Sequence, residues 1–167
     1  MTSHAHASAP PLIVRCAIVT ISDTRSLDTD KSGAAIADLL AAHGHQIVHR
    51  AVVPDDIEAI RVEVLKQVDK EVMQVVITTG GTGIAARDCT FEALTPVLDL
   101  ELAGFGELFR MLSYQDIGPG AMLSRAFAGI IRRRLVVCLP GSEAAVRLAM
   151  TKLVLPELNH LIREVTK

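Results

Sequence analysis

A glycine-rich segment followed by acidic and hydroxyl side chains carries the clearest chemistry in this sequence. Residues 80–83 read GGTG, and Asp88 and Thr90 follow shortly after. Successive glycines let backbone N–H groups converge on an anion, and a helix predicted to begin near Thr90 would add its positive end. The segment therefore predicts a phosphate site. A carboxylate beside it suggests a Mg²⁺ ion that bridges the two negative groups.

Other interpretations of the same segment stay open. Asp88 has a purely structural alternative, in which it caps the helix that starts near Thr90, with Glu92 in the first turn. Residues 81–86 (GTGIAA) also satisfy the G-x-G-x-x-A pattern of dinucleotide-binding loops. That pattern follows the third predicted strand and not the first, so nucleotide-linked redox chemistry is a remote alternative.

The elements that must position these residues alternate between buried strands and amphipathic helices. β-Branched or apolar runs predict strands over 14–21, 46–53, 73–79 and 135–139. Helical periodicity predicts helices over 33–43, 55–70, 90–98, 101–112 and 120–131, and one after Ser142 that Pro156 kinks or divides. This alternation predicts a single three-layer α/β/α domain with a mostly parallel sheet, over residues 13–167, preceded by a flexible tail at 1–12.

A polar cluster follows each of the four predicted strands. Ligands of parallel sheets bind at these carboxyl ends of the strands. The clusters are S-D-T at 22–24, P-D-D at 54–56, the glycine segment, and P-G-S at 140–142. The predicted helix over 120–131 would in addition present the hydroxyl of Ser124 and the guanidinium of Arg125 to an anion, and would end at three arginines, 132–134. The sequence therefore predicts one ligand site at the carboxyl edge of the sheet.

Composition limits the kind of ligand. The 167 residues are 50% hydrophobic and 22% charged, with a net charge of −2 and only 3% aromatic side chains. A near-neutral chain with few aromatic residues disfavours nucleic acid and anionic membrane as partners. The sequence has no apolar run long enough for a membrane span, and its start lacks a secretory pattern, so we expect a cytoplasmic protein.

Taken together and in order, seven motifs resemble the MoaB/Mog family of molybdenum cofactor biosynthesis proteins, from about residue 14 to the end. They are SDT at 22–24, DKSG at 30–33, VPDD at 53–56, TTGGTG at 78–83, RD-x-T at 87–90, AMLSRA at 121–126 and LPGS at 139–142. The short chain, residues 104–128 and LPELNH at 155–160 are more similar to the MoaB branch than to Mog.

The resemblance implies a molybdopterin-binding domain that, in active members, transfers adenylate from Mg-ATP to the terminal phosphate of molybdopterin and releases pyrophosphate. By motif position, Asp55 and Asp88 match the family's two catalytic acidic residues and would hold Mg²⁺, and Ser124 matches a serine of the same site. The implied substrate ligands are Ser22, Asp23, Thr24, Gly80, Gly81, Thr82, Gly83, Thr90, Arg125, Pro140, Gly141 and Ser142. The resemblance further implies small-molecule partners, pterin and ATP, and a homo-oligomer, either a trimer or a hexamer.

One departure from the family pattern leaves a second function open. Where many relatives have proline after the P-G-S or P-G-N turn, this chain has Glu143, which adds a carboxylate near the expected anion site. If that charge excludes ATP, the protein would be a non-catalytic molybdopterin carrier or assembly protein. The two-carboxylate mechanism also requires that Asp55 and Asp88 lie close enough to share a hydrated cation.

Overall fold

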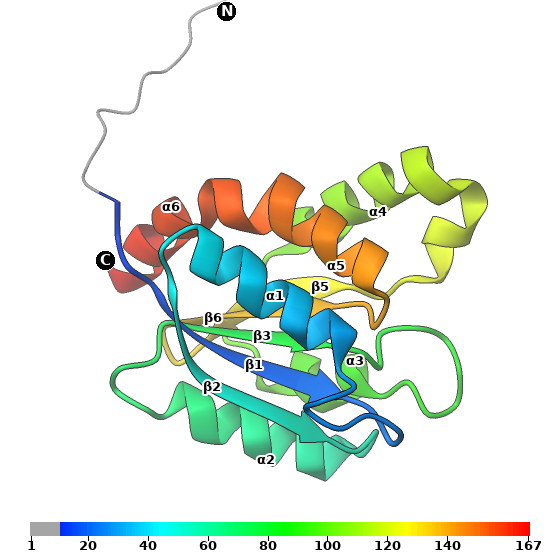
Figure 1. Ribbon diagram of the computed structural model, residues 1–167, viewed down its shortest axis with the longest axis horizontal. Helices are drawn as coiled ribbons and strands as arrows, with labels where there is room; N and C mark the ends of the chain where they lie inside the picture. The colour runs from blue at the N-terminus through cyan, green and yellow to red at the C-terminus, as the bar shows by residue number, and fades with distance from the viewer. Residues whose placement is uncertain (1–10) are drawn as a thin grey trace, which may run out of the picture.

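The computed structural model describes residues 11–167, and residues 1–10, which make up most of the predicted tail, lie outside the described part. One six-stranded sheet runs through the molecule in the order β2-β1-β3-β6-β5-β4 (Figure 1). Its strands are β1 (Arg15–Ile21), β2 (Gln46–Val53), β3 (Val75–Thr79), β4 (Leu100–Glu101), β5 (Phe127–Ile131) and β6 (Arg134–Leu139). The strands β2, β1, β3 and β6 are parallel, whereas β5 and β4 are antiparallel to their neighbours.

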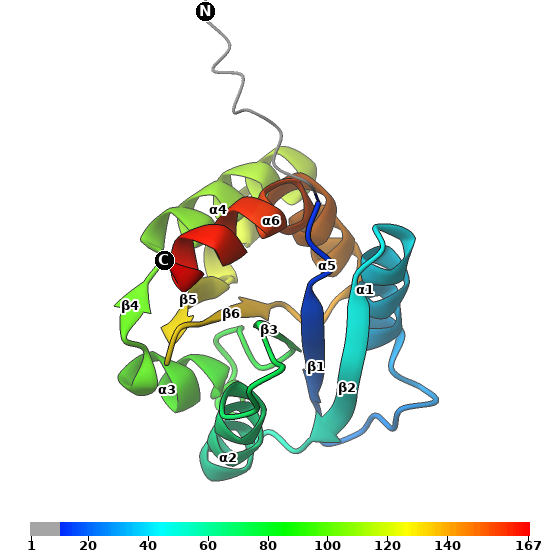
Figure 2. The same ribbon diagram turned by 90° about the vertical axis from the view of Figure 1, so that its left-hand side faces the viewer.

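Helices cover both faces of the sheet, as Figures 1 and 2 show. The helices α1 (Lys31–Ala42), α4 (Ala103–Ile117), α5 (Glu143–Ala149) and α6 (Leu155–Thr166) pack on one face, and α2 (Ile57–Val68) and α3 (Thr90–Leu94) pack on the other. The predicted three-layer α/β/α domain with a mostly parallel sheet is therefore confirmed. Most predicted elements begin or end within a few residues of the observed ones.

The continuous apolar run in β1 results from burial on both faces of the sheet. Cys16 and Ile18 belong to the core beneath α1 and α5, whereas Ala17 and Val19 belong to the core above α2. Successive side chains of a strand point to opposite faces, so a strand covered on both sides needs apolar residues at every position. This explains why the central strands could be predicted from composition.

Aspartates start two of the helices, and a glycine follows the end of one. The carboxylate of Asp30 accepts the backbone N–H of Gly33 at 2.9 Å, and Asp56 accepts that of Ala59 at 2.8 Å. Gly44, which follows α1, has a φ of +77°. These contacts satisfy backbone groups that a helix end leaves unpaired. Asp30 and Asp56 therefore mark helix starts, and Gly44 marks the turn that ends α1.

The predicted helix over 120–131 is wrong. A 3₁₀ segment, η2, covers Gly118–Leu123, and the chain then enters strand β5. Ser124 and Arg125 therefore lie on an extended connection and not on a helix. The arginines at 132–134 do not end a helix either, because Arg132 and Arg133 form the β5–β6 turn with φ values of +47° and +61°.

The C-terminal helical region is interrupted before Pro156. A π-helical segment, Met150–Val154, joins α5 to α6, and Pro156 lies in the first turn of α6. Proline has no N–H to donate and its ring clashes with the preceding turn, so the wider π-helical turn directly before it relieves the conflict. Among residues 11–167, no helix combines the length and apolarity that a membrane crossing requires.

Candidate functional site

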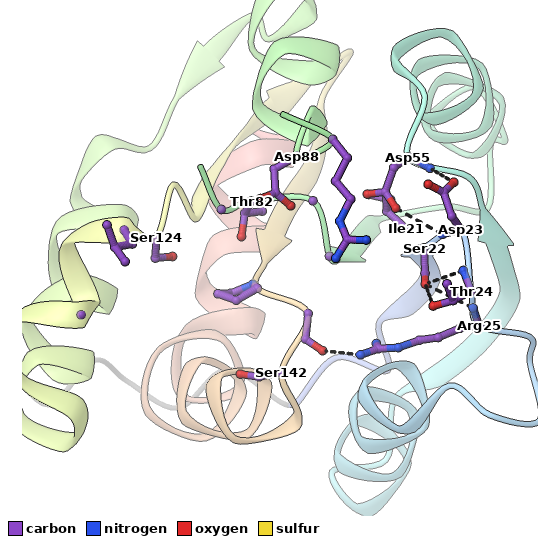
Figure 3. A pocket seen from close by; sticks show the side chains of 18 residues that line it. Ile21, Ser22, Asp23, Thr24, Arg25, Asp55, Thr82, Asp88, Ser124 and Ser142 are labelled. Atoms are coloured by element: carbon purple, nitrogen blue, oxygen red, sulfur yellow. Dashed lines mark hydrogen bonds between the residues drawn. The ribbon is translucent and has the colours of Figure 1, made fainter. Parts of the chain in front are cut away.

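A cavity of about 440 Å³ opens at the carboxyl ends of the parallel strands (Figure 3). Its walls come from the loops after β1, β2, β3 and β6 and from η2, so segments far apart in the chain meet there. The lining residues are Ile21, Ser22, Asp23, Thr24, Arg25, Asp55, Gly80, Gly81, Thr82, Gly83, Arg87, Asp88, Gly120, Leu123, Ser124, Pro140, Gly141 and Ser142. The structure thus brings together all but two of the predicted site residues. The exceptions are Thr90 and Arg125.

The glycine loop lies against the end of β1 in a conformation that side chains would disturb. Gly80 and Gly81 have φ values of +109° and +64°. A Cβ atom at Gly80 would lie 2.3 Å from the carbonyl oxygen of Ile21. The hydroxyl of Thr90 donates to the Gly80 carbonyl at 2.9 Å, and the Thr90 N–H donates to Gly81 at 3.0 Å. Thr90 therefore supports the loop from behind, fully buried and away from the cavity.

Two carboxylates hold the loops after β1 and β2 together. The Asp55 N–H donates to the Asp23 carboxylate at 3.0 Å, and the Asp23 N–H donates to the Asp55 carboxylate at 3.2 Å. Figure 3 shows both side chains and these reciprocal bonds at the cavity wall. The exchange of backbone donors places two negative groups side by side, a costly arrangement unless a positive partner is near.

The pKa of the Asp55 carboxyl reflects this crowding. Partial burial raises the pKa most, and the negative charges of Asp23 and Asp88 raise it further. The hydrogen bond from the Asp23 backbone and the positive charge of Arg87 lower it. Asp88 therefore lies close enough to Asp55 to act on it electrostatically.

Asp88 does not cap the following helix. Its carboxylate accepts the N–H of Ala85 at 2.8 Å, and its own N–H donates to the Ala85 carbonyl at 2.9 Å. The residue before α3 is Cys89, and its side chain makes no capping hydrogen bond. The structural alternative for Asp88 is therefore wrong, and the carboxylate instead lines the cavity within a tight loop.

Arg25 is a cavity residue that the sequence analysis missed. Its guanidinium donates to the hydroxyl of Ser32 at 2.7 Å and to the carbonyl of Gly141 at 3.1 Å. Arg25 thus connects the loop after β1 to the turn after β6 (Figure 3). Its position directly after the S-D-T motif was a signal that could have found it.

The acidic departure at Glu143 lies outside the cavity lining. Ser142 caps α5 by accepting the N–H of Ala145 at 3.3 Å, which places Glu143 in the first turn. The Glu143 carboxylate pairs with Arg147 at 2.8 Å, one turn further along the helix. Glu143 is not among the lining residues, and its ion pair lies within α5.

Among residues 11–167, no cysteine or histidine lines the cavity. Burial raises the pKa of the Cys16 and Cys138 thiols to about 12. Burial and then neighbouring carboxylates, Asp55 first, also raise the pKa of Cys89, which disfavours its thiolate. Within residues 11–167, no group of three or more histidine, cysteine or acidic side chains is arranged to hold a metal ion.

The fold and the cavity define a class of protein: an α/β domain with a glycine loop and carboxylates in a cavity at the carboxyl edge of its sheet. A family model described as "Probable molybdopterin binding domain" matches residues 17–160. The chain belongs to this family, which confirms the resemblance in the sequence motifs.

Individual relatives place the chain on the MoaB side of the family. Molybdenum cofactor biosynthesis protein B of Bacillus cereus is 54% identical over 160 residues, which cover 95% of each chain. A crystal structure of molybdenum cofactor biosynthesis protein B superposes with a TM-score of 0.92 at 54% identity, over 95% of this chain and 99% of that one. The tungsten cofactor synthesizing protein MoaB of Pyrococcus furiosus superposes with a TM-score of 0.84 at 35% identity, over 95% and 100% of the two chains.

Proposed function

We propose that the protein acts in molybdenum cofactor biosynthesis by binding molybdopterin in the cavity and transferring adenylate from Mg-ATP to its terminal phosphate. The observation that carries this proposal is the meeting of Asp55 and Asp88 with the glycine loop in one cavity. Such a cavity offers backbone donors for a phosphate and carboxylate oxygens for a cation. The family membership and the names of the relatives support the pterin as substrate.

The proposed reaction needs positioning more than a strong base. An oxygen of the pterin phosphate attacks the α-phosphorus of ATP, the bond from that phosphorus to the bridging β-phosphate oxygen breaks, and pyrophosphate leaves. A phosphate monoester is largely deprotonated near neutral pH, because its second pKa is about 6. The difficulty is to bring two anions together, so positioning and charge neutralisation provide the catalysis. The glycine loop would bind phosphate, and Arg25 and Arg87 would offset its charge.

The residues of the cavity fit Mg²⁺ as it is usually bound beside phosphates. Such a site takes one or two carboxylates, with substrate phosphates and waters completing the coordination. Asp55 and Asp88 would supply the carboxylate oxygens. Burial and then the negative charge of Asp23 raise the pKa of Asp55, and a cation would offset the second of these effects. When bound, Mg²⁺ neutralises charge on the phosphates of ATP.

Adenylyl transfer is tested with molybdopterin, ATP and Mg²⁺, with adenylylated pterin and pyrophosphate as the measured products. We expect the wild-type protein to form both, and the Asp88→Asn variant to be about 100-fold slower. Asparagine keeps the oxygen that accepts the Ala85 N–H, so the loop is retained while the charge is lost. The Glu143→Gln variant is the matched control, and we expect no change, because this side chain lies outside the cavity.

A non-catalytic carrier remains the alternative, and pterin binding separates the two functions. Pterin fluorescence measures binding without ATP. Retained binding with no adenylylated product above the Asp88→Asn level would select the carrier. A protein that does not bind molybdopterin at all would overturn both functions. The position of Glu143 weakens the alternative. This carboxylate was expected to exclude ATP, but it pairs with Arg147 and does not line the cavity.

A further inference from the structure

Arg125 lies behind the glycine loop and holds it at several points. Its backbone N–H donates to the carbonyl of Thr82 at 2.7 Å. Its guanidinium donates to the carbonyl of Gly83 at 2.7 Å and to that of Asp88 at 2.8 Å, and pairs with the carboxylate of Glu92 on α3. One side chain thus joins both ends of the segment that presents Asp88 to the cavity.

The guanidinium also contacts an aromatic ring. Its carbon lies 5.4 Å from the centre of the Phe91 ring, which fits a cation–π contact. The Phe91 ring packs edge-on against Phe127 of β5, with ring centres 5.3 Å apart. The side chain of Arg125 is 28% exposed. A planar group held between an aromatic face and two carbonyl oxygens has little freedom to turn.

The segment 83–89, which carries Asp88, is held to the Ser124 segment by the bonds from Arg125. The hydrogen bonds between Ala85 and Asp88 are internal to the loop, so they preserve its turn without fixing where the turn lies. The bonds from Arg125 to Gly83 and Asp88 connect the same turn to the segment that carries Ser124. The position of the Asp88 carboxylate relative to Ser124 therefore depends on Arg125.

We propose that Arg125 is a positioning residue, which fixes the Asp88 loop against the Ser124 segment and does not bind the substrate. This replaces the expectation from sequence that Arg125 is a substrate ligand. The catalytic part of the inference rests on the proposed adenylyl transfer, whereas the structural part stands without it. Lysine cannot replace Arg125, because its donors sit on one nitrogen and cannot span the three acceptors that the three guanidinium nitrogens reach.

Hydrogen exchange of the ligand-free protein tests the structural part. In Arg125→Lys we expect the amides of residues 83–89 to exchange about tenfold faster, with the central strands unchanged. Glu92→Gln, which removes one partner and leaves the carbonyl bonds, should show a smaller increase in the same residues. Arg61→Lys is the matched control, because Arg61 donates to Ala93 of the same helix at 3.0 Å and does not contact the loop. Unchanged exchange at 83–89 in both test variants would overturn the inference.

Steady-state kinetics test the catalytic part. We expect Arg125→Lys to lower kcat more than about tenfold, with KM for ATP and for the pterin within about twofold of wild type. A raised KM with an unchanged kcat would instead make Arg125 a ligand-binding residue and overturn the positioning role. If wild-type protein forms no adenylylated pterin, the proposed function fails, and the exchange measurement still decides whether Arg125 holds the loop.

Discussion

Burial raises the pKa of Asp55 most, and charged side chains from two neighbouring loops shift it further, which can be tested one charge at a time. Asp23 raises the pKa of Asp55 through its negative charge, and Arg87 lowers it. We therefore expect Asp23→Asn to lower the pKa of Asp55 and Arg87→Gln to raise it. Carboxyl carbon chemical shifts of Asp55, followed by NMR over a pH titration, measure both changes.

The opposite signs make this pair of variants its own control. Asparagine at position 23 keeps the oxygen that accepts the Asp55 N–H, so the loop contact survives. A general loosening of the site would expose Asp55 and move its pKa in the same direction in both variants. Shifts of equal sign would therefore contradict the electrostatic account.

The location of the site could be predicted from sequence, but the direction of its loop side chains could not. Parallel strands end at one edge, so the polar residues that follow them were expected to meet. Thr90 and Arg125 belong to the same motifs yet lie behind the loop, whereas Arg25 faces the cavity. The contacts of Thr90 depend on the positive φ values of Gly80 and Gly81, and those of the two arginines on segments distant in the chain, which residue types alone do not specify.

At the scale of secondary structure, the elements that sequence predicted correctly are those with long or uniform patterns. The β5 strand was missed because residues 127–131 (FAGII) are too few to separate strand from helix by periodicity. Burial of Phe127 and Ile131 against α2 and α3, together with pairing to β6, decides the outcome. These are tertiary contacts, so the local sequence does not contain them.

The glycine loop supplies a stability prediction for a single element. Gly81 combines a φ of +64° with a neighbour that would block a side chain, because an added Cβ would lie 2.4 Å from the Thr90 hydroxyl. We expect Gly81→Ala to lower the free energy of unfolding by about 2–3 kcal/mol, since it adds backbone strain and displaces the hydroxyl that holds Gly80. Urea denaturation followed by circular dichroism measures the change.

Gly44→Ala provides the comparison for strain alone. Gly44 has a similar φ of +77°, yet no atom lies within 4 Å of an added Cβ. The expected loss is about 1 kcal/mol, from the backbone term only. Equal losses in the two variants would show that the contact with Thr90 contributes nothing to the loop.

At the scale of the whole molecule, the two faces of the sheet are covered but one helical layer leaves apolar side chains exposed. On α4, Leu108 and Met111 are about half exposed, and Ile117 is 68% exposed. Met122 of η2 is 74% exposed. Leu108 also borders an apolar hollow of about 470 Å³ between α4 and α6. Leu108 and Met111 lie one turn apart on α4, and contiguous apolar surface is typical of protein interfaces, whereas single exposed side chains are ordinary.

We propose that this surface joins copies of the chain, as the resemblance implied for a trimer or hexamer. Sedimentation equilibrium should then give a mass of three or six times 17.9 kDa. Leu108→Lys should shift the mass towards the monomer, because a buried unpaired ammonium group is costly in an apolar interface. Val62→Lys is the control, since Val62 is 62% exposed but lies on α2, across the sheet. A monomeric wild type, or equal effects of both variants, would contradict an interface at α4.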